Sequence, residues 1–64
     1  MKMKTRTVLK VQDEGSHYLA IRTEDRHNPY RVYKVWYGHR KLLAKFADLC
    51  SAVGYIHELI LMGN

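Results

Sequence analysis

The sequence predicts an α+β domain, an antiparallel β-meander of three or four strands with one C-terminal α-helix packed on one face. Residues 5–11, 17–23 and 30–37 are rich in the β-branched and aromatic types that favour strands. Short polar or proline-containing segments separate these runs. Beyond them, apolar residues recur at helical spacing up to about residue 62. Because no repeat, linker or low-complexity tract divides the 64 residues, we expect one small domain spanning 1–64.

The first two strands are predicted to pair as a hairpin around the polar segment 13–16, which contains Gly15. Side chains alternate between the two faces of a strand, so each run can be divided into two sets. The set expected to face the core is Thr5, Thr7, Leu9, Val11, Leu19 and Ile21. The set expected to face outward is Lys4, Arg6, Val8, Lys10, Tyr18, Ala20 and Arg22.

The third strand follows a loop at 24–29 in which Pro29 forces the preceding residue towards extended geometry. Two phases are open for residues 30–37. One buries Tyr30, Val32 and Trp36, and the other buries Tyr33, Val35 and Tyr37. The positions of Lys34 and Arg31 slightly favour the second phase.

Two interpretations remain open after Gly38. In the first, one helix runs from about residue 40 to 62, although its basic start would oppose the helix dipole. In the second, residues 41–46 form a fourth strand with Leu42, Ala44 and Phe46 inward. Asp48 would then cap a shorter helix whose apolar stripe is Leu49, Val53, Ile56 and Ile60. Both interpretations place a helix across one face of the sheet.

The end of the helix is apolar on more than one side, which is typical of a helix buried on more than one side. A domain of this size has a small core that supplies about 3–5 kcal/mol unaided. We therefore expect a homodimer. The predicted subunit contact consists of Ile56, Leu59, Ile60, Leu61 and Met62.

Enzymatic and metal chemistry are not indicated, and we expect no catalytic residue, no metal, no cofactor and no small-molecule substrate. Cys50 and His57 are about 10 Å apart along a helix axis, too far to share a zinc ion. The acidic pairs lie in turns, where opposed placement across a substrate is not available. One unpaired cysteine, no signal-length apolar run and no membrane-spanning stretch predict a cytoplasmic protein without membrane association.

A basic charge balance gives the main functional indication. Eleven Lys+Arg against six Asp+Glu give a net charge of +5, and such an excess favours polyanionic partners. We predict a non-enzymatic protein that binds DNA or RNA through the sheet face away from the helix, using its cations for phosphates and its rings for stacking. The predicted binding residues are Lys4, Arg6, Lys10, Tyr18, Arg22, Lys34, Trp36, Arg40 and Lys41.

The alternative is a protein–protein interaction subunit that associates through its apolar helix and has no nucleic-acid role. In predicted topology, a sheet followed by a helix, the chain resembles the small integrase-arm and plant AP2-type DNA-binding domains. That resemblance implies a sheet that enters the major groove. The chain lacks the glycine and aromatic pattern of those domains before the final helix.

Overall fold

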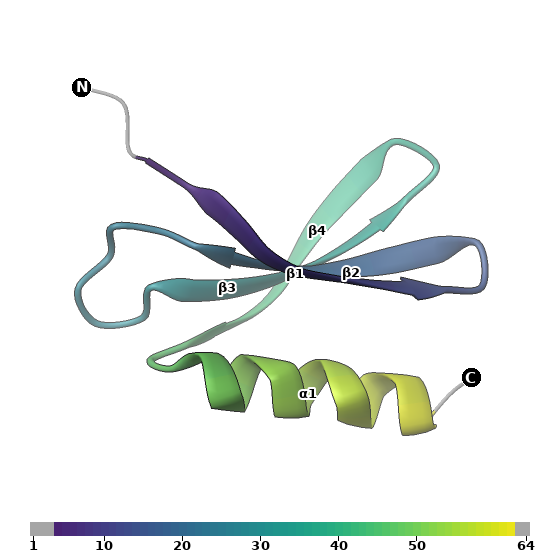
Figure 1. The fold of residues 1–64 in the computed structure, drawn as a ribbon. Coiled ribbons are helices and arrows are strands. Elements are labelled where there is room, and N and C mark those ends of the chain that lie inside the picture. Colours follow the sequence, from purple (N-terminus) through teal and green to yellow (C-terminus); the bar gives the residue numbers. More distant parts are fainter. Residues whose placement is uncertain (1–3, 63–64) are drawn as a thin grey trace.

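The computed structural model describes residues 4–62 as one four-stranded antiparallel sheet followed by one helix (Figure 1). The elements are β1 (Arg6–Asp13), β2 (Ser16–Arg22), β3 (Tyr30–Trp36), β4 (His39–Phe46) and α1 (Leu49–Met62). Strand order in the sheet is β1-β2-β3-β4, so each strand pairs with its neighbour in sequence. The predicted α+β fold, an antiparallel meander with a C-terminal helix on one face, is confirmed.

The helix lies along one face of the twisted sheet and contacts all four strands (Figure 1). Ala20, Val32 and Ala52 are completely buried where the two layers meet, and Ile56 is 1% exposed. Small side chains at positions 20 and 52 let the helix approach the sheet closely, as close packing of two layers requires. The partly buried apolar residues around this centre are Val8, Leu9, Val11, Tyr30, Leu43, Phe46, Tyr55, Leu59 and Ile60.

The predicted phase of β2 is wrong. Tyr18 and Ala20 belong to the core beneath the helix, while Leu19 and Ile21 alternate to the opposite face. Both phases of this strand carry apolar side chains, and the smaller Ala20 is the one that the helix covers. The slight preference for burying Tyr33, Val35 and Tyr37 of the third strand is also wrong, since Val32 and Tyr30 face the helix.

Bulges shift the phase within both edge strands. The register between β1 and β2 slips between Thr7 and Leu9, so Val8 packs against the core and Thr7 pairs with Ile21 on the other face. A similar slip separates Ala44 from Leu42 in β4. Leu42, expected to be inward, is therefore 40% exposed, whereas Leu43 packs on the core. Bulges of this kind break the simple alternation used to assign faces.

Residues after Gly38 follow the second of the two open interpretations, with a fourth strand and a shorter helix. Tyr37 and Gly38 both have positive φ, 45° and 78°, which is the geometry of a two-residue turn between antiparallel strands. After this turn the chain therefore runs back along β3 as strand β4, and the helix begins only after that strand ends. Asp48 then caps α1, because its Oδ1 accepts a 2.7 Å hydrogen bond from the Ser51 backbone N–H.

This hydrogen bond from the Ser51 backbone, with a further one from the Ser51 side chain, lowers the pKa of Asp48. The apolar stripe of the helix is also rotated from the expected one. Ala52 and Ile56 are buried, whereas Leu49 and Val53 are 39% and 40% exposed. Across residues 4–62, no helix combines the length and apolar character required to cross a bilayer.

Candidate nucleic-acid interface

The sheet face away from α1, called the open face below, is defined by strand register. Directly paired residues of an antiparallel sheet point to the same side, and successive residues alternate. Counting from Ala20 and Val32 beneath the helix therefore assigns the other set to the open face. Its members are Thr7, Lys10, Gln12, His17, Leu19, Ile21, Arg31, Tyr33, Val35, Arg40, Leu42 and Lys45.

Charge on the open face has one sign. Its formal charges come from Lys10 on β1, Arg31 on β3, and Arg40 and Lys45 on β4. The six acidic residues of the chain all lie elsewhere, in the turns, in the loop after β2, in the helix region or on the covered face. These are Asp13, Glu14, Glu24, Asp25, Asp48 and Glu58. The formal charge of the open face is therefore entirely positive, with no acidic side chain among its members.

Asp25, in the loop after β2, is an acidic residue whose pKa is influenced by a cation of the open face. Its Oδ1 accepts a 3.0 Å hydrogen bond from the His27 backbone N–H, and this bond is the main cause of a lowered pKa for Asp25. The positive charge of Arg31 adds a small contribution in the same direction. Arg31 Nε is buried and has no hydrogen-bond partner among residues 4–62.

Apolar side chains occupy the middle of the open face. Leu19 pairs with Tyr33, which in turn pairs with Leu42, so three strands contribute to one row. Ile21 is 8% exposed although no helix covers it, because neighbouring side chains of the same face surround it. The Arg40 guanidinium lies 4.5 Å from the centroid of the Tyr33 ring, a cation–π contact that holds both side chains against the sheet.

The rings expected on this face are on the other one. Tyr18 is 6% exposed and belongs to the core beneath the helix, so it offers no stacking surface. Trp36 and Lys34 share the phase of Val32 on the covered side, and the Lys34 ammonium lies 6.0 Å from the centroids of both Tyr18 and Trp36. The predicted placement of these three residues on the open face is wrong, for the same reason as the wrong phases of β2 and β3.

The remaining predicted binding residues fall into three places. Lys10 and Arg40 lie on the open face as expected. Lys4, Arg6 and Arg22 line a hollow of about 920 Å³ beside the loop after β2, together with Glu24 and Asp25. Lys41 pairs with Lys34 on the covered side of the sheet, beyond the helix. The predicted binding residues therefore lie in separate places and do not form one surface.

Three residues of the open face were missing from the predicted binding set: Arg31, Tyr33 and Lys45. Arg31 and Tyr33 belong to the phase of the third strand that was expected to be buried. Lys45 lies between Ala44 and Phe46, so the fourth-strand interpretation placed it outward by alternation, but it was not included in the binding set.

Most of the predicted subunit contact lies in the core. Ile56 is 1% exposed, so its assignment to an interface is wrong, and Leu59 and Ile60 pack against the sheet. Leu61 and Met62 are 71% and 76% exposed. Association of two copies through the helix stays a prediction, and it now involves only the last turn.

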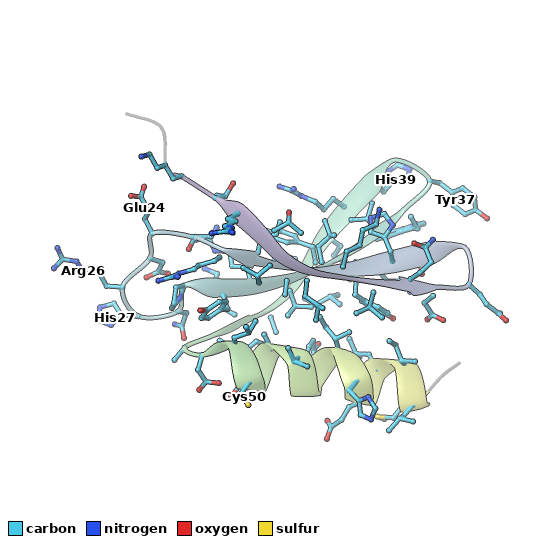
Figure 2. The ribbon with its side chains drawn as sticks, viewed as in Figure 1. Glu24, Arg26, His27, Tyr37, His39 and Cys50 are labelled. Atoms are coloured by element: carbon cyan, nitrogen blue, oxygen red, sulfur yellow. The ribbon has the colours of Figure 1, made fainter. Side chains whose placement is uncertain are left out.

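Metal-ligating side chains are dispersed over the molecule. Among the described residues, no group of three or more His, Cys, Asp or Glu side chains could hold an ion. Cys50 is exposed on the helix, and His27 and His39 lie in separate parts of the molecule (Figure 2).

Comparison with known proteins finds no matching family model, no matching curated protein and no matching solved structure. The function of the chain is therefore inferred from the geometry and charge of its own faces.

Proposed function

We propose that the protein binds nucleic acid through the open face. The observation that carries this proposal is the sign of the charge: four cations, contributed by three of the four strands, with all six acids placed elsewhere. A surface of this kind attracts a polyanion by displacing the counterions condensed on its phosphates. A sheet face that is exposed to solvent only for solubility does not need to lack acidic residues. A mixture of positive and negative side chains keeps a protein equally soluble.

A duplex suits this face better than a single strand. Binding of unpaired bases relies on exposed rings, and the Tyr33 ring is covered by the Arg40 guanidinium while Tyr18 and Trp36 face the other way. The edge strands β1 and β4 are about 14 Å apart at the usual strand spacing. That separation is close to the roughly 12 Å width of a DNA major groove. Lys10 on one edge and Lys45 on the other can then reach opposite phosphate strands, with apolar side chains between them.

The test is a fluorescence-anisotropy titration of labelled mixed-sequence DNA, as a duplex and as a single strand, over a range of salt concentrations. Every phosphate contact that a substitution removes should lower the slope of log affinity against log salt by about 0.9. The double variant Lys10→Gln/Lys45→Gln removes two open-face charges and should lower the slope by nearly 2. The duplex should bind more tightly than the single strand.

A matched control removes the same charge elsewhere. Arg22→Gln/Arg26→Gln changes the hollow beside the loop, with Arg26 at the loop tip (Figure 2), and should leave the slope nearly unchanged. No binding of either DNA at low salt would overturn the proposal. Equal losses in the two double variants would also overturn it, because the open face would then contribute only through net charge.

A further inference from the structure

A second basic site lies on the covered side of the sheet, where the two hairpins extend beyond the C-terminal end of the helix (Figure 1). It is a pocket of about 470 Å³ between the β1–β2 turn and the β3–β4 hairpin, within the usual volume range for small-ligand sites. We call it the hairpin pocket. Its relevant lining residues are Glu14, Ser16, Lys34, Trp36, Tyr37 and Lys41.

Two lysines stand side by side in this pocket. Lys34 on β3 and Lys41 on β4 are direct register partners, and both line the cavity. Directly opposed like charges destabilise a sheet, because their side chains are neighbours on one face. Among the described residues neither ammonium forms an ion pair with a carboxylate. An anion bound between them would remove the repulsion and supply the missing counter-charge.

Aromatic walls accompany the two charges. The Lys34 ammonium lies 6.0 Å from the ring centroids of both Tyr18 and Trp36, and of these two rings Trp36 is the one that lines the pocket. Trp36 is half-buried and leaves part of its indole surface towards the cavity. Tyr37, at the hairpin tip, is 87% exposed and also lines the pocket. The site therefore offers a flat ring surface next to a doubly cationic end.

The nearby acids limit which anions fit. Asp13 Oδ1 accepts a 2.9 Å hydrogen bond from the Glu14 backbone N–H, so this carboxylate is engaged by its own turn. Glu14 is exposed at the rim of the pocket, on the side of the β1–β2 turn. A bound anion would have to lie towards β3 and β4, where the lysines are, and present its uncharged part to the remaining wall.

We infer that the hairpin pocket binds a phosphate monoester that carries a planar aromatic ring, with a nucleoside monophosphate as the simplest case. The phosphate lies between Lys34 and Lys41, and the ring stacks on Trp36. The pocket is on the side of the sheet opposite to the open face. This inference therefore does not depend on the binding of nucleic acid by that face.

The chain contains a single tryptophan, so its fluorescence reports directly on this pocket. Purified protein at low salt is titrated with AMP, with adenosine and with inorganic phosphate, and the Trp36 emission is followed. AMP should quench the emission saturably, because its base stacks on the indole. Adenosine lacks the phosphate and inorganic phosphate lacks the ring. Each should therefore bind only at concentrations at least about tenfold higher than AMP, since a charge-assisted contact is worth that factor or more.

Variants on one strand separate a site from a general charge effect. Lys41→Gln should weaken AMP binding about tenfold, whereas Lys45→Gln removes the same charge from the opposite face of β4 and should leave it unchanged. Both lysines are exposed, so neither substitution disturbs the core. Glu14→Gln should tighten binding by removing a repulsive charge from the rim.

Three results would overturn the inference. The first is the absence of saturable quenching by AMP at millimolar concentrations. The second is equal binding of adenosine and AMP, which would leave the lysines without a role. The third is equal weakening by Lys41→Gln and Lys45→Gln. DNA binding through the open face is measured separately, by anisotropy with the Lys10→Gln/Lys45→Gln variant, so either proposal can fail alone.

Discussion

Both faces of the sheet carry apolar side chains, more of them on the covered face, but they use these side chains differently. On the covered face, small or branched residues such as Ala20 and Val32 are completely buried against the helix. On the open face, Leu19, Tyr33 and Leu42 form a row that stays partly exposed and is flanked by cations. One face holds the molecule together, and the other is available for a partner.

The covered face is the more apolar of the two, and it also meets the geometric requirement for a helix to pack on it. Close packing requires a surface that lets the two layers approach, and positions 20, 32 and 52 provide it because their side chains are short. The open face carries lysine and arginine beside its apolar row. Covering it with the helix would bury charges without partners, at a cost larger than the apolar area could offset.

Val32 and Val35 provide the most direct test of this comparison, because the same residue type lies on both faces of β3. Val32 is fully buried and Val35 is half-buried on the open face. Val32→Ala should lower the free energy of unfolding by roughly 2–3 kcal/mol, because methyl groups are removed and a cavity is left behind. Val35→Ala should cost less than about 1 kcal/mol. Urea denaturation of both variants measures the difference.

A domain with about 3–5 kcal/mol of total stability would keep only a small margin after the Val32 substitution. Equal costs at the two positions would mean that both faces are covered in solution. The assignment of the open face as a free surface would then be wrong.

Gly54→Ala is expected to stabilise α1, the helix that covers the buried face, by a smaller amount. Gly54 lies in the middle of α1, is exposed, and a Cβ built there meets nothing within 4 Å. Alanine has the higher helix propensity, so unfolding should require about 0.5–1 kcal/mol more. Thermal unfolding followed by circular dichroism measures the gain, and a loss of stability would show that another molecule occupies the space beside this glycine.

The smallest expected effect concerns the pH dependence of the helix cap. Because the pKa of Asp48 is lowered from 3.8 in the folded protein, its carboxylate stabilises the fold above that pH, and the contribution disappears as the pH falls through the lower folded value. Asp48→Asn keeps a capping side chain but cannot titrate. The difference in melting temperature between the two proteins should therefore change only in this acidic range. Asp25, whose pKa is also lowered, is present in both and cancels.

A large difference between the two proteins at neutral pH would contradict this description, because both side chains accept the Ser51 hydrogen bond. Asp48→Ala serves as the control, since it removes the cap and should lower the melting temperature at every pH.

Several elements followed from local chemistry. Residues 30–36 are β-branched or aromatic with few exceptions, and a strand forms there regardless of which side faces the core. Asp48 was expected to cap the helix in one of the two interpretations left open after Gly38, and its bond to Ser51 shows that it does so. The binding site was predicted less well, because Tyr18, Lys34 and Trp36 were assigned to the open face by the wrong phases of β2 and β3, two strands in which either phase carries apolar residues.

Local sequence was sufficient for the kind of fold, the positions of the first three strands and the excess of positive charge, since each depends on composition or on neighbours along the chain. It left open whether the residues after Gly38 form a fourth strand or the start of the helix. The side of each strand that the helix covers was settled instead by tertiary packing. In β2 and β3 both phases carry apolar residues, and the choice depends on how closely a distant segment, with Ala52 and Ile56, can pack against Ala20 and Val32. That contact joins residues far apart in the sequence, and alternation within a single strand contains no information about it.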